Sequence, residues 1–433
     1  MPRFALMPLL GAIVGCAASP TYDAADESYY LNDPRRVEEA YAAALEDRGQ
    51  DALLGIEKLL SAALLRGDRD AAMKMAARAS LFVNVFVAGE KGERDALAFL
   101  GREKNKPFKG EPHERVMADY YLGVLRLTEG DAEGALAAFR SAILKDRGSF
   151  LMPVEPSKAR EGATNARRYL FEDDYALLDL LAAKCWQILG EPEDGEKYLQ
   201  AAKSLRGEIS WLFDEAMDPA TNVFVLVETG RVPYKVRTGP QGAILGYQKG
   251  PEVPVEAVTI DGTKISYALG EDLHVQATTL GGRQVDELNV AKAQGQQALQ
   301  AAGFGVASAG YFLAIAGAQS DNQAMQAAGL IALGVGIATM IFSGVAIDPS
   351  ADTRAWTTLP GQIYLAVGRA APGSRVRLAV TAPGGQSQEW TDVPVADRLN
   401  VYWIRLLPGR TGGTWPGAVE PEPSSNPEHG GAP

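Results

Sequence analysis

The chain has 433 residues, of which 46% are hydrophobic, so it is long enough for two or three domains with sizeable buried cores. Its 54 acidic residues outnumber its 42 basic residues and give a net charge of -12. This balance argues against a nucleic-acid-binding protein, because binding to the phosphate backbone requires clustered positive charge.

The first sixteen residues have the features of a secretory signal. Arg3 gives a positive start, an apolar run follows, and Ile13–Cys16 places a small residue directly before a cysteine. This stretch resembles the lipobox of bacterial lipoproteins, in which the signal is removed and the cysteine is acylated. The resemblance implies a signal peptide over 1–15 and palmitate on Cys16. It also implies attachment to the outer membrane on the periplasmic side, because Ala17 rather than an aspartate follows. A frayed apolar N-terminus that happens to contain a cysteine is the alternative.

Residues 16–33 are short of large aliphatic side chains and predict a loose, lipidated tether. Asp33 and Pro34 then offer an N-cap and a first helical residue. From 34 to 217, Ala, Leu, Glu, Lys and Arg dominate and apolar residues recur at helical spacing, which predicts a helical domain. Cys185 lies within this pattern and is expected to be a buried, inert thiol.

Residues 117–146 resemble a tetratricopeptide (TPR) hairpin of two antiparallel helices. The residues that carry the resemblance are Leu122, Gly123, Gly130, Ala135, Phe139 and Ala142. Gly130 is expected to end the first helix with a positive φ, and Phe139 to fill the gap that the small residues leave. Asp119 departs from the pattern, which has Trp there. Similar turns at Gly67 and Gly190 lie roughly 60 residues away on either side rather than 34, so TPR-like hairpins spaced by extra segments, or a plain helical bundle, remain open.

Three further stretches carry a wider resemblance: Pro107–Arg115, Asp173–Leu178 and Asp352–Pro360. Together with the hairpin they are similar to a family of bacterial outer-membrane lipoproteins with TPR-like helical hairpins. The resemblance implies an architecture and attaches no activity to it.

After Asp218 the pattern changes to short β-branched and aromatic runs parted by Gly- and Pro-containing turns. The predicted strands are Asn222–Val227, Val232–Arg237, Pro254–Ile260, Lys264–Leu269, Leu273–Ala277, Gln362–Val367, Arg375–Thr381, Gln386–Thr391 and Asn400–Leu407. Residues 218–290 and 347–408 are therefore expected to be two parts of a β-sandwich, or two small β units, and the fold class α+β. The Gly- and Pro-rich tail 409–433 is expected to be disordered.

The insertion between the two β parts, residues 291–346, predicts an apolar helical hairpin. Its two runs, Ala301–Ala318 and Ala324–Ala346, contain no charged residue, and the second is long enough to cross a bilayer. Small residues recur every fourth position and are expected to let the helices touch; they are Gly310, Ala314, Ala318, Ala324, Ala328, Ala332 and Gly336. Residues expected to face lipid or another protein layer are Leu330, Leu333, Ile337 and Ile341. Membrane insertion, burial between protein layers or at an oligomer interface, and an Ala-rich surface helix are the three interpretations.

Residues that could carry chemistry are sparse. His113, His274 and His429 lack metal-ligand spacing, and the sequence has no P-loop and no nucleophile elbow, so we expect no catalytic residue, no metal and no cofactor. The acidic run Glu172–Asp174 is typical of a solvated or capping surface, although it could hold a cation. A basic cluster in the first strands could meet lipid headgroups or an anionic glycan, or could be alternating outward charges; it comprises Arg231, Lys235, Arg237 and Lys249.

Two functions follow from these features. The first is a non-catalytic periplasmic scaffold, lipid-anchored at Cys16, that binds another cell-envelope protein through its TPR-like helical surface. The second is a cell-wall enzyme or ligand carrier with a site between the helical and β parts. The absence of a convergent polar constellation favours the first. The expected partners are a cell-envelope protein, the membrane through the lipid and the 301–346 hairpin, and a second copy of the chain.

Overall fold

The computed structural model describes residues 20–46, 50–89, 107–146, 175–279, 284–320, 322–346, 350–383 and 386–407. Its helices are α1 (Pro20–Tyr30), α2 (Pro34–Glu46), α3 (Ala52–Arg66), α4 (Arg69–Gly89), α5 (Pro112–Glu129), α6 (Ala132–Asp146), α7 (Ala176–Ile188), α8 (Pro192–Leu205), α9 (Ser210–Met217), α10 (Leu273–Thr279), α11 (Gln284–Gln319) and α12 (Gln323–Ala346). Its strands are β1 (Val223–Thr229), β2 (Tyr234–Thr238), β3 (Ile244–Gln248), β4 (Ala257–Ile260), β5 (Thr263–Lys264), β6 (Ser266–Asp272), β7 (Gln362–Gly368), β8 (Arg375–Ala382), β9 (Gln386–Pro394) and β10 (Asn400–Arg405).

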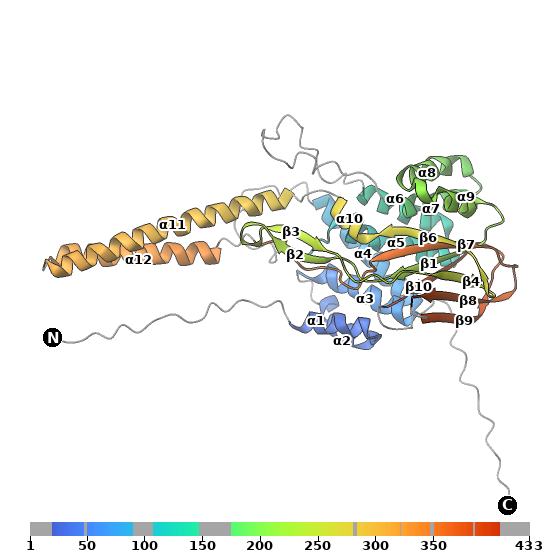
Figure 1. Cartoon of the computed structure of the whole chain (residues 1–433), viewed down its shortest axis with the longest axis horizontal. Helices are drawn as coiled ribbons and strands as arrows, with labels where there is room; N and C mark the ends of the chain where they lie inside the picture. Colours follow the sequence, from blue (N-terminus) through green and yellow to red (C-terminus); the bar gives the residue numbers. More distant parts are fainter. Residues whose placement is uncertain are drawn as a thin grey trace, which may run out of the picture.

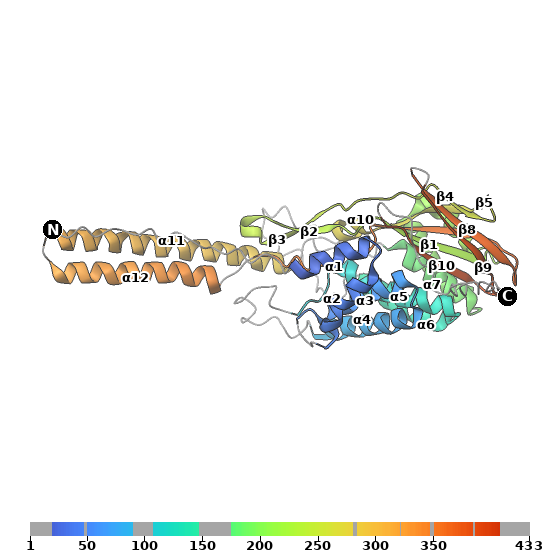
Figure 2. The ribbon, with the colours of Figure 1, turned by 90° about the horizontal axis from the view of Figure 1, so that it is seen from below.

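The body has three layers, with helices on one side and two sheets stacked on the other (Figure 2). The sheet next to the helices has the strand order β10-β1-β7-β6, and the outer sheet has the order β5-β4-β8-β9. Strands β2 and β3 form a separate antiparallel pair. The predicted α+β class is confirmed, with strands from both sides of the α11–α12 insertion paired in the same sheets.

Alternating side chains explain how the inner sheet holds two cores together. Phe224 and Leu226 of β1 point into the core shared with the helices, whereas Val223, Val225 and Val227 point into the core between the sheets. Because both faces are covered, β1 is apolar at almost every position rather than at every second one. The helical and β parts therefore share one continuous core, and the boundary predicted near residue 218 does not separate two independent cores.

The helical layer is a succession of antiparallel helices in which each packs mainly against its neighbours in the chain, from α2 to α8 (Figure 1). The turns at Gly67, Gly130 and Gly190 are alike. Each glycine has a positive φ, between 73° and 85°. In each, the glycine N–H and the N–H after it donate to carbonyls three and five residues back. This hydrogen-bond pattern ends a helix and requires a left-handed residue, so glycine is favoured there.

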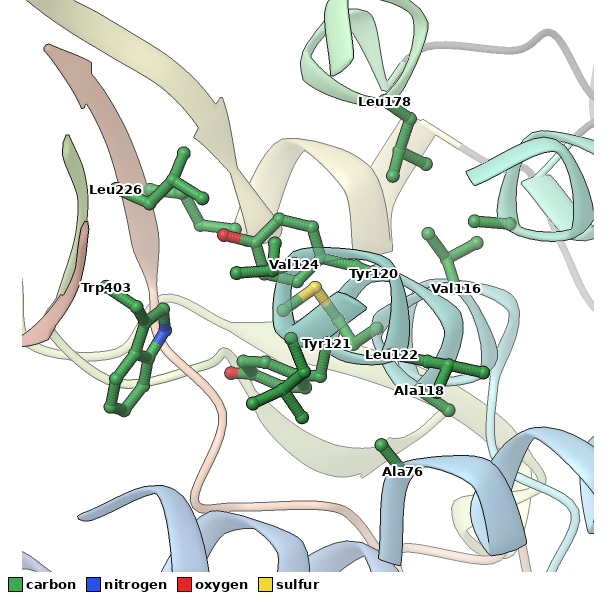
Figure 3. Close-up of a cluster of buried hydrophobic side chains, with 14 of the residues drawn as sticks. Ala76, Val116, Ala118, Tyr120, Tyr121, Leu122, Val124, Leu178, Leu226 and Trp403 are labelled. Atoms are coloured by element: carbon green, nitrogen blue, oxygen red, sulfur yellow. The ribbon is translucent and has the colours of Figure 1, made fainter. Parts of the chain in front are cut away.

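The hairpin α5–α6 packs at backbone distance. A Cβ added to Gly123 would lie 2.4 Å from the Phe139 ring, which is fully buried. Ala135 and Ala142 are also fully buried beside Phe139 on α6, and Leu122 lies at the edge of the same core. On the sheet side of α5, Tyr121 points toward Trp403 of β10, with ring centroids 6.5 Å apart (Figure 3).

The segment 350–361, which returns the chain from α12 to β7, joins the layers. Trp356 is fully buried; its backbone N–H donates to Glu114 at 2.7 Å and its indole N–H donates to Ser61 at 2.8 Å. Thr358 donates to the same Ser61 hydroxyl at 2.8 Å. Arg354 pairs with Asp51 at the start of α3 at 2.6 Å. The segment is thus a structural connector fixed by polar contacts to α3 and α5.

Three local predictions are wrong. Residues 20–30 of the predicted tether form helix α1, which buries Tyr29 and Tyr30 against the body. Residues 273–277 belong to helix α10 rather than to a strand. The side chain of Asp272 caps this helix by accepting the backbone N–H groups of His274 and Val275. Strand β3 was not predicted, since glycine and exposed polar residues interrupt its apolar pattern.

Candidate membrane-interacting hairpin

The hairpin α11–α12 projects from the body along the long axis of the molecule (Figure 1). Among the described residues, the first part of α11 contacts the body at β3, and Lys292, Ala293 and Gln296 in this part are buried. Beyond this base, α11 and α12 pack against each other. The described side chains of 301–340 are mostly exposed, apart from those at the contact between the two helices, which argues against burial between layers of the same chain.

Glycines spaced seven residues apart form the contact between the two helices. A Cβ added to Gly310 would lie 2.4 Å from the backbone nitrogen of Leu333, and one added to Gly336 would lie 2.3 Å from that of Ala307. A Cβ added to Gly329 would lie 2.3 Å from the backbone nitrogen of Ala314. Only glycine permits backbones to approach this closely.

The small-residue contact predicted from every fourth position is correct only in part. Gly310, Ala314, Ala332 and Gly336 lie in the contact. Ala318, Ala324 and Ala328 are exposed. A strict four-residue spacing drifts around a helix with 3.6 residues per turn, so it leaves the contact after a few turns, whereas alternating steps of three and four residues stay in it.

Large apolar side chains cover the outside of the hairpin. The most exposed are Phe304, Val306, Tyr311, Phe312, Leu330, Ile331, Val335 and Ile337. Leu330 and Ile337 were predicted to face outward and do so, Leu333 is half-buried, and the side chain of Ile341 lies outside the described set. Two stretches are long and apolar enough to cross a membrane, Lys292–Gln319 and Gln323–Met340. In the most apolar 18 residues of each, only 28% and 11% are buried.

The residues singled out from the sequence fall into three groups. Leu122, Gly123, Gly130, Ala135, Phe139 and Ala142 are packing residues of the α5–α6 hairpin. The proposed lipid site Cys16, the acidic run 172–174 and His429 lie outside the described residues. Cys185 is buried and its surroundings raise the pKa of its thiol to about 12 by desolvation, so it is an unreactive side chain.

The basic residues of the first strands do not form a common charged surface. Lys235 is buried and pairs with Glu114 at 2.7 Å. Arg231 stacks over the Tyr30 ring at 3.5 Å, and Arg237 donates to the carbonyl of Ala351 at 3.0 Å. Lys249 is about half exposed and pairs with Glu252. Because each basic side chain has its own partner in a neighbouring segment, the contacts argue against a common binding patch for lipid headgroups or glycans.

Buried ionisable groups are the feature that sequence patterns missed. Asp119 pairs with Lys145 across α5 and α6, and Asp26 of α1 pairs with Lys58 of α3 at 2.6 Å. Partners so distant in the chain leave no local signal. Among the described residues no group of three or more His, Cys, Asp and Glu side chains is placed to hold a metal ion.

Two buried groups have pKa values that are shifted in opposite directions. Desolvation raises the pKa of Glu228 to about 7, although Arg405 nearby and the Tyr121 hydroxyl at 3.0 Å favour its charged form. Desolvation lowers the pKa of His113 to about 4, and its ring packs edge-on against Tyr247. Between the ordinary and the raised pKa, Glu228 is thus protonated in the folded protein and ionised in the unfolded chain. Between the lowered and the ordinary pKa, His113 is neutral in the folded protein and charged in the unfolded chain.

These two shifts change the free energy of unfolding with pH in opposite directions, so their effects partly cancel in the wild-type protein. From pH 4.5 to about 7 the folded Glu228 holds a proton that the unfolded chain has lost, so its contribution to the free energy of unfolding falls by about 3 kcal/mol. From about pH 4 to 6.5 the unfolded His113 holds the extra proton, so its contribution rises by about 3 kcal/mol. Urea denaturation measures the free energy of unfolding of each variant minus that of the wild type. This difference should increase with pH for Glu228→Gln and decrease with pH for His113→Phe. Parallel pH curves for all three proteins would contradict both assignments.

No protein-family model matches the chain, and no curated protein sequence matches it.

Proposed function

We propose that the protein is a non-catalytic, membrane-attached scaffold of the bacterial cell envelope, and that the α11–α12 hairpin enters the lipid bilayer. The observation that carries this proposal is the projecting hairpin, whose two uncharged runs expose large apolar side chains. Apolar surface gains about 25 cal/mol per Å² when it leaves water. A contiguous exposed surface of this kind marks a membrane or protein contact.

The position of α1 supports attachment at the same end of the molecule. Tyr30 donates a hydrogen bond to the carbonyl of Thr357, and Asp26 accepts one from the Thr357 hydroxyl, so α1 is tied to the segment that leaves the hairpin. Both views show α1 beginning at the end of the body from which the hairpin projects (Figures 1 and 2). Cys16 is four residues before Pro20, a reach of at most about 14 Å. A lipid on Cys16 and the hairpin would thus meet one membrane.

The helical layer supports a scaffold whose partner binds on its outside. The inner faces of α3, α5 and α7 are covered by the inner sheet and by the 350–361 segment. A cell-envelope partner would therefore bind the outer helices α4, α6 and α8 rather than an inner groove. The boundary between the helical and β layers is filled by large side chains such as Trp356, Trp403 and Tyr121, which favours the scaffold over an enzyme or carrier with a site there.

Charged substitutions in the hairpin should prevent membrane binding. In a Cys16→Ser background from which residues 1–15 are also removed, so that neither the apolar signal nor the lipid is present, the triple variant Leu330→Lys, Ile331→Lys, Val335→Lys should no longer float with phospholipid vesicles. Each of these side chains is more than half exposed, so the fold should tolerate the change. A lysine at the centre of a spanning helix costs about 3 kcal/mol, which is roughly a hundredfold in partitioning per residue.

The matched control places lysines at three similarly exposed apolar positions of the body, Leu81, Leu144 and Trp211. These variants should float as the Cys16→Ser protein does. Equal loss in both triple variants, or unchanged flotation of the hairpin variant, would contradict membrane insertion. A Cys16→Ser protein that does not float and forms a stable oligomer through the hairpin would assign the exposed surface to a second copy instead.

A further inference from the structure

The hairpin is apolar around its whole circumference, which excludes one way of binding a membrane. On α12, Gly329 and Gly336 face α11, while Leu330, Ile331 and Val335 are exposed on the remaining sides, because successive residues are rotated by about 100°. A helix that lies flat in the headgroup region needs a charged or polar face toward water. The described part of α12 offers none, so the hairpin suits full immersion.

The hydroxyl of Thr339, within the second run, has a hydrogen bond inside its own helix, because it donates to the carbonyl of Val335 at 2.9 Å. Hydroxyls bonded to the preceding turn can be placed in lipid without a further partner. The backbone of both helices is satisfied internally, as a membrane requires.

The lengths of the two runs match a complete crossing. At about 1.5 Å per residue, 301–318 measures about 27 Å and 324–346 about 34 Å, and the hydrocarbon core is about 30 Å thick. The first run is a little short and the second a little long, and tilting or local adjustment of the bilayer accommodates differences of this size.

The tip of the hairpin distinguishes a complete crossing from a partial one. The sequence between the runs is Gln319–Gln323, all polar, with the charged Asp321 at its centre. If the hairpin stopped halfway, this tip would lie in the middle of the hydrocarbon, where polar groups are most unfavourable. Only a tip that passes the far leaflet returns these residues to water.

We propose that the hairpin spans both leaflets and presents residues 319–323 on the face of the membrane opposite the body. This inference rests on the proposed function, because it assumes that the hairpin enters a bilayer. The hairpin would then contact lipid across the full thickness of the hydrocarbon core. As a consequence, the protein exposes a short polar segment to a second compartment while both hairpin ends, the β-strands and α1 remain in the first.

Site-specific labelling tests the crossing. The Cys16→Ser protein with Ser320→Cys at the tip is added to preformed phosphatidylcholine vesicles that enclose a membrane-impermeant maleimide dye. Cys185 is buried and adds no reactive thiol. The tip cysteine should react with the enclosed dye and resist the same dye added outside. The control Ser204→Cys, at an exposed position on α8, should react only with the dye added outside.

The outcomes separate this inference from the proposed function. A protein that floats with the vesicles but whose tip cysteine reacts only from outside keeps the membrane-binding function and overturns the crossing. A floating protein whose tip reacts from neither side until detergent is added places the tip within the membrane, which also overturns it. A protein that does not float at all contradicts the proposed function itself.

Discussion

Replacing Trp356 with alanine should lower the free energy of unfolding by about 3–5 kcal/mol, the range for deleting a fully buried large aromatic side chain. Trp356 is completely buried between α3, α5 and the inner sheet, and its ring lies 5.8 Å from that of Tyr121. The substitution leaves a cavity where the layers join and removes the indole donor to Ser61. Denaturant unfolding at neutral pH measures the loss.

Two further variants show which part of the effect comes from packing. Trp356→Phe keeps most of the ring and loses the hydrogen bond, so it should cost less than the alanine variant, about 1–2 kcal/mol. Trp211→Ala removes a half-exposed indole on α9 and should change stability by no more than about 0.5 kcal/mol. An alanine variant at 356 that is as stable as the one at 211 would mean that the 350–361 segment does not hold the layers together.

The parts of the fold that follow from local patterns could be predicted from the sequence. The strand at 222–227, the hairpin turn at Gly130 and the two apolar runs each depend on residues within a few positions of one another. Their chemistry is sufficient to select a strand, a left-handed turn or a long helix, and tertiary contacts reinforce the choice.

Elements decided by distant contacts could not be predicted in this way. Helix α1 has a composition typical of a spacer, but Tyr29 and Tyr30 dock against Arg405 and Thr357, more than 300 residues away. In α10, the side chain of Asp272 outweighs the β propensity of the residues that follow it. Neither contact leaves a periodic signal near the residues that it organises.

For the candidate site, the sequence predicts the existence of the hairpin but only part of its outward-facing side: Leu330 and Ile337 are exposed as predicted, whereas Leu333 is half-buried. An Ala- and Gly-rich helix offers several small-residue rows, and composition alone does not choose among them. The row through Gly303, Gly310 and Gly317 is selected because its glycines alternate with Ala307 and Ala314 at the three- and four-residue steps that keep one face toward α12. The exposed apolar side chains follow from that choice.

The buried pair of Asp119 and Lys145 explains why an aspartate stands at position 119. It stands on α5 where the TPR pattern that the sequence resembles has Trp, and it is fully buried against Lys145 of α6. Desolvation lowers the pKa of the Lys145 ammonium, and the Asp119 carboxylate counters this by favouring the charged form. A buried pair of this kind is a weak source of net stability, because desolvation offsets much of the attraction, but each partner depends strongly on the other.

Breaking the pair should therefore be far more damaging than removing it. Asp119→Leu alone should cost about 3–5 kcal/mol, because it leaves the Lys145 ammonium buried without its carboxylate. The double variant Asp119→Leu, Lys145→Met replaces both charges with apolar groups of similar size and should recover most of that loss. Urea denaturation of the wild-type, single and double variants gives the coupling between the two sites. Additive losses in the double variant would show that the two side chains do not depend on each other, and would contradict the buried pair.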